Sequence, residues 1–403
     1  MVELGNKLLG SLEKGMMLYS IFQMFCMSAI FSFTYTFYIR KKQDTKSCFI
    51  FLLWVTIFPL NAIMAFSATK DVLYAGIFMI CSMLYARIIE CEDCLNNKIF
   101  SALFVLFSFG QMIFRNQGKY VFVFGMIFML VAIKKYRKKL LMLSLIICVL
   151  FSLYDGPLTS MVAHKRGDSV NEMMSIPCVQ LSRAVLYDDL GEEDQKLIKE
   201  YIPGYESYEM FEAISDSMKN TFNTNKFKAN PTEFLNLWIK VGIQHPITYI
   251  DAAARITIGL WYPDMNYNDE KAYHPYCEWK STGQDNPEAF EGYPLVKRNP
   301  IKGFGWLEQI NNKLAYENNY QNIPIISLLF SSGIVIWMIL FYVMYAIYYK
   351  KYKYLAVAAF PFALWLTLIL GPVVLYRYIY PIELTVPILF TLCRNIKQDN
   401  LTI

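Results

Sequence analysis

Four basic residues and one acidic residue stand in short polar segments between long apolar runs of the sequence. Lys70 and Asp71 occur in Ser-Ala-Thr-Lys-Asp, Arg115 and Lys119 in Phe-Arg-Asn-Gln-Gly-Lys-Tyr, and Arg377 in Leu-Tyr-Arg-Tyr-Ile-Tyr-Pro. Arginine presents a planar fork that binds two phosphate oxygens, whereas lysine presents a point charge. Brought together, these residues would form a basic pocket suited to the phosphate of a lipid.

A simpler role for such residues must be weighed against a binding site. Basic residues at the ends of membrane-spanning helices also occur because their long side chains reach the lipid headgroups. One residue would favour that simpler role, but four at corresponding helix ends, beside Asn116 and Asp71, favour a binding site. Asp71 has two candidate roles, general base and ion-pair partner of Lys70 or an arginine, and the partner role is the stronger candidate.

The apolar runs that carry these segments are predicted to be membrane-spanning helices. Hydrophobic residues make up 55% and charged residues 18% of the 403 residues, whereas globular domains average roughly 45–50% and 25%. A helix needs about 20 apolar residues to cross a bilayer, so we expect nine spans, two of them short (120–133 and 140–154). The runs are 16–39, 48–66, 72–89, 98–115, 120–133, 140–154, 324–348, 355–373 and 378–393.

Basic clusters between the runs predict the orientation of the chain. With nine spans, four clusters fall on one side, which the positive-inside rule makes cytoplasmic. The N-terminus and residues 155–322 are then extracytoplasmic, and the C-terminus is cytoplasmic. The clusters are Arg40, Lys41, Lys42 and Lys46; Lys134, Lys135, Arg137, Lys138 and Lys139; Lys350, Lys351 and Lys353; and Arg394 and Lys397.

The polar segment between the sixth and seventh runs divides the chain into three parts. These are an N-terminal bundle at 1–154, an extracytoplasmic domain at 155–322 and a C-terminal bundle at 323–403. Short helices are expected at 192–202 and 206–220. Because no alternating strand pattern occurs, the domain is expected to be mainly helical and the fold class all-α.

Two longer helices are predicted in the second half of the polar segment. Asn230 is a helix-capping residue followed by a proline suited to the first helical position. A second helix begins at Pro246, and its Asp251 and Arg255 are four residues apart, a spacing that favours an ion pair. Residues 261–302 are expected to form an ordered loop. The apolar face of the first helix is predicted to contain Phe234, Leu235, Trp238 and Val241.

Signals for metals, nucleic acids and disulfides are weak. The net charge of +5 comes from basic residues in short loops beside apolar runs, so it does not indicate a nucleic-acid partner. The sequence contains neither a paired metal-ligand motif nor a glycine-rich phosphate loop. No cofactor is indicated by the sequence, and the use of a divalent metal ion is left as an open alternative. Cys178 and Cys277 would pair if the polar segment faces an oxidising compartment.

Short segments that match a known family follow one another along the chain in order. They are Thr69-Lys70-Asp71; Arg115-Asn116 with Gly118 and Tyr120; Ser175-Ile176-Pro177 with Gln180 and Arg183; Trp238 with Gly242, Pro246 and Tyr249; Trp261-Tyr262-Pro263; and Tyr376-Arg377-Tyr378 with Pro381. In these segments the chain resembles bacterial polytopic membrane proteins related to the GT-C glycosyltransferases, which use polyprenyl-phosphate-linked sugars.

The resemblance implies a GT-C-like transmembrane bundle in the bacterial plasma membrane that transfers a sugar from a polyprenyl-phosphate-linked donor to a cell-envelope glycan or polymer. A carboxylate would deprotonate the acceptor hydroxyl, which attacks the anomeric carbon as the lipid phosphate leaves. Lys70, Arg115 and Arg377 would stabilise that phosphate, with Lys119 in the same pocket. The residues expected to line the substrates are Asn116, Gln180, Arg183, Trp261, Tyr262 and Tyr378.

The start of the chain differs from the GT-C pattern. These enzymes carry their catalytic acid in the first outer loop, after a first span. Met1 stands just ahead of what resembles the second span, so we expect a preceding segment that contains the catalytic carboxylate. Within the present sequence, Asp71 is the candidate.

A second function class is a non-catalytic membrane carrier or assembly component for surface polysaccharide. A transporter is expected to place polar or charged residues near the middle of its spans. The apolar runs here contain little of this kind beyond Gln23, Asn61 and Gln111, whereas charges gather near the helix ends. This distribution favours chemistry at the membrane surface over passage through the membrane.

Overall fold

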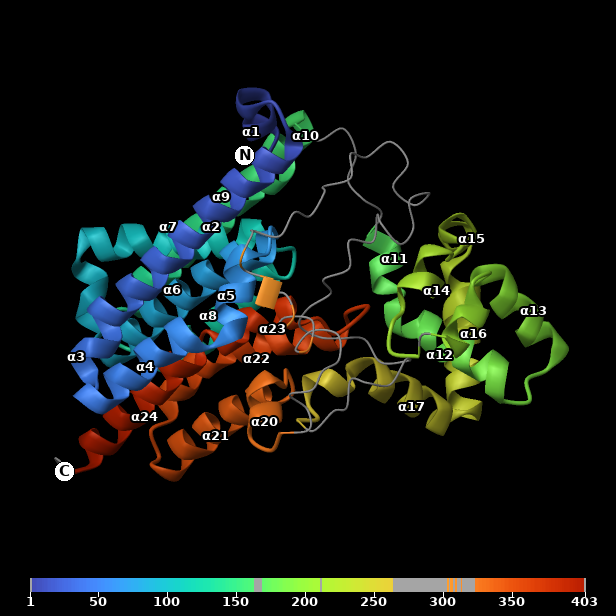
Figure 1. The fold of residues 1–403 in the computed structure, drawn as a ribbon. Helices are drawn as coiled ribbons and strands as arrows, with labels where there is room; N and C mark the ends of the chain where they lie inside the picture. The colour runs from blue at the N-terminus through green and yellow to red at the C-terminus, as the bar shows by residue number, and fades with distance from the viewer. Residues whose placement is uncertain are drawn as a thin grey trace.

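The computed structural model describes residues 2–162, 169–210, 212–263 and 323–401, together with positions 303, 305, 306, 309 and 313. Within these residues every regular element is a helix, which confirms the all-α class. Figure 1 shows a bundle of long helices and, beside one end of it, a smaller unit made of the helices α11 to α17. We call the smaller unit the cap.

The bundle is assembled from the two ends of the chain. Its first part contains α1 (Val2–Leu9), α2 (Leu12–Thr34), η1 (Tyr35–Ile39), α3 (Arg40–Lys42), α4 (Thr45–Ile57), α5 (Pro59–Phe66), α6 (Lys70–Glu90), η2 (Glu92–Asn96), α7 (Lys98–Phe114), α8 (Gly118–Ala132), α9 (Arg137–Leu153), η3 (Tyr154–Leu158) and α10 (Thr159–Val162). Its second part contains α20 (Ile326–Phe330), α21 (Ile334–Tyr348), η8 (Tyr352–Tyr354), α22 (Leu355–Ile369), α23 (Tyr376–Glu383) and α24 (Val386–Leu401). Packing of α22 on α8 and of α23 on α6 joins the two parts.

The nine expected apolar runs coincide with helices, but fewer helices reach the length of a span. Four stretches within the described chain are long and apolar enough to cross a membrane, and a bent pair would make a fifth. The four are Lys14–Ile39, Lys70–Glu90, Arg137–Met161 and Tyr352–Ile369; the pair is Thr45–Ile57 with Leu60–Phe66, bent by 49°. Three further apolar helices, α7, α8 and α21, are 10–17 residues long.

Proline explains two departures from the expected runs. The second run is broken at Phe58, which is extended (ψ 114°) ahead of Pro59, because a residue before proline disfavours the helical region. The ninth run is divided into α23 and α24, and Pro387 stands in the first turn of α24, where a missing N–H costs no hydrogen bond. The run expected at 140–154 is longer than predicted, because helical structure continues through η3 to Met161.

Helix α6 is the most enclosed of the four long apolar stretches, since 83% of its most apolar 18-residue segment is buried. Its Tyr85 stacks on Phe360 of α22 at 3.9 Å and donates a hydrogen bond to Gln111 Oε1 at 2.9 Å. A side chain at Gly125 of α8 would collide with the Phe360 ring, since an added Cβ would lie 2.2 Å from it. These contacts fix α6 on several sides at once.

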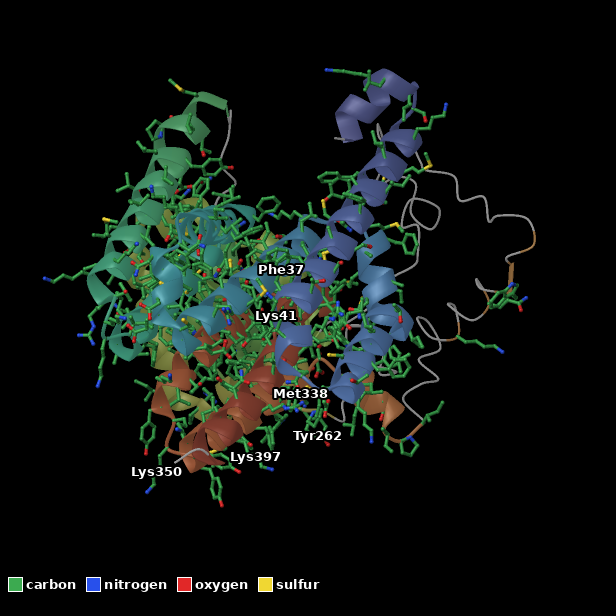
Figure 2. All side chains as sticks on the ribbon, turned by 90° about the vertical axis from the view of Figure 1, so that its left-hand side faces the viewer. Phe37, Lys41, Tyr262, Met338, Lys350 and Lys397 are labelled. Atoms are coloured by element: carbon green, nitrogen blue, oxygen red, sulfur yellow. The ribbon has the colours of Figure 1, made fainter. Side chains whose placement is uncertain are left out.

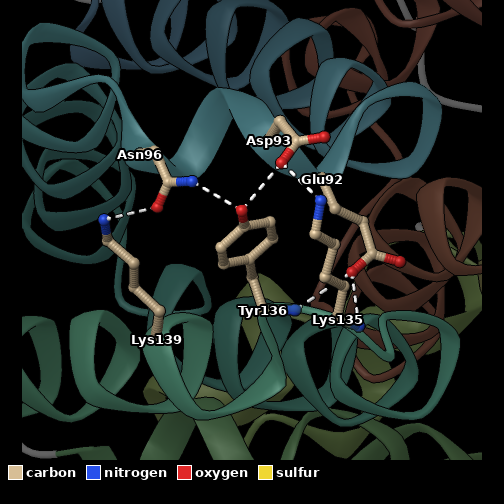
Figure 3. Close-up of polar contacts among 6 residues, drawn as sticks. All are labelled: Glu92, Asp93, Asn96, Lys135, Tyr136 and Lys139. Atoms are coloured by element: carbon tan, nitrogen blue, oxygen red, sulfur yellow. Dashed lines mark hydrogen bonds and ion pairs between the residues drawn. The ribbon is translucent and has the colours of Figure 1, made fainter.

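The loops at one end of the bundle contain the basic clusters. Figure 3 shows how one of these loops meets η2: Glu92 accepts hydrogen bonds from the backbone N–H groups of Lys135 and Tyr136 at 2.7 and 3.1 Å, and Asp93 pairs with Lys135 at 2.8 Å. Arg394 of α24 contacts Asp44 at 3.4 Å. We call this the basic end. Figure 2 looks onto it and labels Lys41, Lys350 and Lys397.

The cap contains α11 (Ser169–Met173), α12 (Ser175–Tyr187), α13 (Glu192–Tyr201), η4 (Tyr205–Glu209), α14 (Asp216–Asn220), α15 (Thr224–Ala229), α16 (Pro231–Gln244), α17 (Pro246–Thr257) and η5 (Ile258–Leu260). The helix predicted at 192–202 is confirmed as α13, whereas the one at 206–220 is divided into η4 and α14. The predicted capping residue of α16 is also confirmed, because the Asn230 side chain accepts a hydrogen bond from the backbone N–H of Glu233 at 3.3 Å.

One prediction about α16 is wrong. Leu235 was expected on its apolar face but is 43% exposed, whereas Phe234, Leu237 and Val241 are buried. The buried residues are three and four positions apart and therefore share one face, while Leu235 is rotated by about 100° from Phe234. The ion pair expected in α17 is confirmed, since Arg255 Nε lies 2.8 Å from the Asp251 carboxylate. The loop expected at 261–302 lies almost wholly outside the described residues.

The cap is fastened to the bundle by hydrogen bonds to three consecutive carbonyl groups. The Gly259 carbonyl accepts from Ser332 Oγ at 2.6 Å. The Leu260 carbonyl accepts from Trp365 Nε1 at 2.9 Å, and the Trp261 carbonyl accepts from Trp337 Nε1 at 2.8 Å. A second link joins Ser215 to the Pro372 carbonyl, through its backbone N–H at 2.9 Å and its hydroxyl at 3.1 Å. Both links use the end of the bundle opposite the basic end.

Gly333→Ala should weaken the first link, because an added Cβ would lie 2.4 Å from the Tyr262 carbonyl oxygen. Overpacking of this kind costs about 1–3 kcal/mol, so the thermal unfolding temperature of the purified protein should fall. Gly156→Ala is the control, since an added Cβ there meets nothing within 4 Å. Equal unfolding temperatures for the two variants would show that the close approach does not matter.

Candidate functional site

Three charged side chains from distant parts of the sequence meet at the end of the bundle opposite the basic end. Asp71 lies between two arginines: its Oδ1 is 3.7 Å from Arg115 Nη1, and its Oδ2 is 3.6 Å from Arg377 Nε. The Asp71 and Arg115 side chains are 10% and 6% exposed, whereas that of Arg377 is 42% exposed. The site is therefore anchored inside the bundle and open on the Arg377 side.

Each residue is placed by the end of a helix. Asp71 occupies the first turn of α6, where a carboxylate is favoured by the positive end of the helix dipole. Arg115 follows α7 in an extended conformation (φ −146°, ψ 136°), and Arg377 is in the first turn of α23. The tight turn from α7 into α8 requires glycine at position 118, because a Cβ there would lie 2.0 Å from the Gln111 carbonyl oxygen.

Tyr378 separates the two guanidinium groups. Its ring centroid lies 4.6 Å from Arg115 Cζ and 5.1 Å from Arg377 Cζ, distances at which the ring attracts a cation. Arg377 Nη2 also donates to the Tyr378 hydroxyl at 3.2 Å. One carboxylate and one aromatic ring thus hold two like charges close together.

One arginine of the site has a donor group that is not used in a hydrogen bond among the described residues. The Asp71–Arg115 separation of 3.7 Å exceeds a normal hydrogen bond. Within the described part of the chain, Arg115 Nη1 is buried and makes no hydrogen bond. An anion with several oxygens, such as a phosphate, would supply the acceptors that this group lacks.

The other residues of the predicted basic pocket lie close by in sequence but make different contacts. Lys70 adjoins Asp71 and is exposed, as is Asn116 beside Arg115. Lys119, in the first turn of α8, places its ammonium group 5.2 Å from the Tyr120 ring and 5.9 Å from the Phe151 ring. These contacts lie outside the group formed by Asp71, Arg115 and Arg377.

The substrate-lining residues predicted in the cap have contacts inside the cap. Gln180 is buried, donates to the Tyr249 carbonyl at 3.1 Å and accepts from Trp238 Nε1 at 2.9 Å. Arg183 forms an ion pair with Asp251 and donates to the Tyr208 hydroxyl at 3.0 Å. Both side chains are therefore engaged in holding α12 against its neighbours, which the sequence did not reveal.

Trp261 and Tyr262 lie at the junction between cap and bundle. Trp261 Nε1 donates to Thr257 Oγ1 at 3.3 Å, and its carbonyl group accepts from Trp337. The two aromatic side chains are 37% and 43% exposed, so they remain accessible at the junction.

Metal and disulfide chemistry receive no support from the described residues. Among them, no group of three or more His, Cys, Asp or Glu side chains could hold a metal ion. Cys178 is fully buried, and burial raises the pKa of its thiol far above the usual value. Its expected partner Cys277 lies outside the described residues.

Two residues at the site were not singled out from the sequence. Tyr74 is fully buried with its ring 5.7 Å from Arg115 Cζ, and Gln117 Oε1 accepts from Arg115 Nε at 3.0 Å. Tyr74 stands three residues after Asp71, a spacing that puts both on one helix face and could have indicated it. Gln117 lies in a turn, where no periodic pattern identifies contacts.

Asp71→Asn should destabilise the protein, because it leaves two guanidinium groups without the carboxylate between them. Loss of one partner of a buried ion pair costs about 3–5 kcal/mol, and the open side of Arg377 favours the lower value. The thermal unfolding temperature should fall, and inorganic phosphate should restore more of it in the variant than in the wild type.

Asp93→Asn is the matched control, because its partner Lys135 is at the basic end and both side chains are exposed. Surface ion pairs contribute little to stability, so this variant should unfold close to the wild-type temperature. An equal response of both variants to phosphate would contradict an anion site at Asp71.

Comparison with known proteins gives a family without an assigned activity. No curated protein and no solved structure matches the chain. One protein family matches residues 1–401, and its description reads "Family of unknown function (DUF6020)". The match extends over the bundle, the cap and the three residues of the ion-paired site. The chain therefore belongs to the DUF6020 family.

Proposed function

We propose that this protein is an integral membrane glycosyltransferase that moves a sugar from a polyprenyl-phosphate-linked donor to a cell-envelope acceptor. The observation that supports it is the convergence of Arg115 and Arg377 on Asp71 at one end of an apolar bundle. Two guanidinium groups at the surface of a membrane suit a lipid-linked phosphate. The resemblance to GT-C enzymes, described above, supplies the reaction class.

The membrane location is supported by the outer surface of the bundle. In the helical stretch Arg137–Met161, which contains α9, only 22% of the most apolar 18-residue segment is buried. Its exposed residues include Leu141, Leu145 and Val149. An exposed apolar surface of this kind marks a site of contact with a membrane or a partner. If the basic end is cytoplasmic, as the positive-inside rule requires, the cap and the Asp71 site face the outside of the cell.

The proposed reaction assigns a separate role to each charged group. The acceptor oxygen forms a bond to the anomeric carbon, the bond from that carbon to the phosphate oxygen breaks, and the polyprenyl phosphate leaves with the electron pair. Arg115 and Arg377 stabilise the charge that develops on the phosphate. Asp71 orients both arginines, and it is also the candidate carboxylate to accept the proton of the acceptor hydroxyl.

The polar residues inside the bundle argue against a carrier. Gln23 Nε2 donates to the carbonyl groups at the end of α5, including that of Ser67 at 2.6 Å. Asn61 donates to the Trp54 carbonyl at 2.9 Å and accepts from Tyr380 at 3.0 Å. Since these groups bond to the protein itself, they do not form the polar path that a transported sugar requires.

Arg377→Ala and Arg115→Ala should each weaken binding of polyprenyl phosphate. Loss of one hydrogen bond to a charged group costs about 1.5–3 kcal/mol, which corresponds to roughly a tenfold to hundredfold weaker dissociation constant. Binding of the phosphate and transfer from radiolabelled polyprenyl-phosphate sugars would both be measured with the full-length protein in lipid nanodiscs. Arg40→Ala is the matched control, because this exposed arginine lies at the basic end, opposite the site.

Each outcome distinguishes between the two function classes. Transfer that is lost with Arg377→Ala and kept with Arg40→Ala supports the enzyme. Binding without transfer, in wild type and variants alike, would favour a carrier or assembly component. Phosphate binding that does not respond to either arginine would remove the proposed site.

A further inference from the structure

The junction between α16 and α17 exposes large aliphatic side chains on the outside of the cap. Ile243, Ile247 and Ile250 are 75%, 81% and 71% exposed. Leu235 and Ile239, at 43% and 50%, continue the same apolar surface along α16. We call these five residues the elbow stripe. Such a run of exposed aliphatic residues is a marker of an interaction surface.

The elbow stripe is separate from the core of the cap. Its three members on α16 are four residues apart and therefore lie within an arc of about 80°. Phe234, Leu237 and Val241, which are buried, occupy the opposite side of the helix. The stripe is therefore a second apolar face of α16 and not a loosely packed part of the first.

The attachment of the cap determines where the stripe lies. The carbonyl of Gly259 is bonded to Ser332 at the end of the bundle opposite the basic end. Ile247 precedes Gly259 by twelve residues, so at 1.5 Å per helical residue it lies within about 18 Å of that attachment. Figure 1 shows α17 running from the cap towards α20 at this end of the bundle.

Aromatic residues are exposed beyond the other end of α17. Trp261, Tyr262 and Trp337 are 37%, 43% and 52% exposed at the junction. Tryptophan and tyrosine are the residues enriched where a membrane meets water. Along α21 the exposed surface continues with Phe341 and Met344. Helix α17 thus joins the elbow stripe, at its first turn, to the exposed aromatic residues that follow its last turn.

We propose that the elbow stripe inserts into the outer leaflet of the lipid bilayer, giving the cap its own contact with the membrane. The inference rests on the membrane location proposed above. Lipid is the occupant because it already surrounds the bundle at this end, and amphipathic helices of this kind bury their apolar face by about 5–10 Å. The contact would keep the cap at a fixed height over Asp71 and Arg377.

The test uses the full-length protein in nanodiscs that contain a phospholipid with a photoreactive diazirine on its acyl chain. After illumination, adducts are mapped by mass spectrometry. We expect adducts on residues 235–250 as well as on α9, whose exposed face is the positive reference. Helix α13 is the negative reference, because it is charged and belongs to the same cap.

A variant pair makes the test specific for the stripe. Ile247→Glu combined with Ile250→Glu should reduce the elbow adducts severalfold and leave those on α9 unchanged. Asn236→Glu combined with Gln244→Glu is the matched control, since both residues are exposed on the neighbouring polar side of α16. It should leave labelling at the elbow unchanged, and equal unfolding temperatures would exclude misfolding of the test variant.

The outcomes separate this inference from the proposed function. Adducts on α9 without adducts on residues 235–250 would overturn the elbow contact and leave the membrane location intact. Chemical cross-links between two elbows in that case would identify a second copy of the chain as the occupant. Absence of adducts on both α9 and the elbow would remove the membrane location and this inference together.

Discussion

The structure depends on holding two positive charges close to one negative charge at the margin of an apolar bundle. Arg115 and Arg377 approach Asp71 to 3.7 and 3.6 Å. Repulsion between the guanidinium groups grows as water is excluded, because the local dielectric constant falls. The carboxylate and the ring of Tyr378 between the two arginines counter that repulsion. Among the described residues, the buried Arg115 Nη1 makes no hydrogen bond. Such a group is tolerated only if the helices around it cannot move apart, and it can then donate to an anion.

The bundle meets this requirement by enclosing α6. Its Tyr85 is bonded to Gln111 of α7 and stacked on Phe360 of α22, which itself occupies the space left by Gly125 of α8. Three helices are thereby fixed around the element that carries Asp71. Gln23 and Asn61 are bonded to neighbouring segments of the bundle, and Asp71, Arg115 and Arg377 lie at helix ends.

The sequence predicted much of the site because charge is rare in apolar surroundings. Asp71, Arg115 and Arg377 could be found from this contrast alone, and their contact could be expected from a shared helix end. The sequence could not predict the contacts of Gln180 and Arg183, because these contacts depend on how α12 packs in the cap and not on any local pattern. Leu235 shows the same limit: a stretch with apolar residues on two faces does not reveal which face the core will cover. The helix cap at Asn230 depends on residues beside it in the sequence and could be inferred, whereas the break at Phe58 inside the run 48–66 was not expected.

The cap and the ion-paired site are connected through a short piece of backbone. Ser215 is bonded to the carbonyl of Pro372, which lies five residues before Arg377. Residues 370–375 join α22 to α23, so the position of the cap and the position of Arg377 are set by the same segment. The second attachment, through Gly259 to Trp261, fixes α17 to α21 and α22. Two attachments prevent the cap from rotating as a rigid unit without moving the start of α23. The geometry of the arginine pair is therefore tied to the cap, although no residue of the described cap forms an ion pair with Asp71.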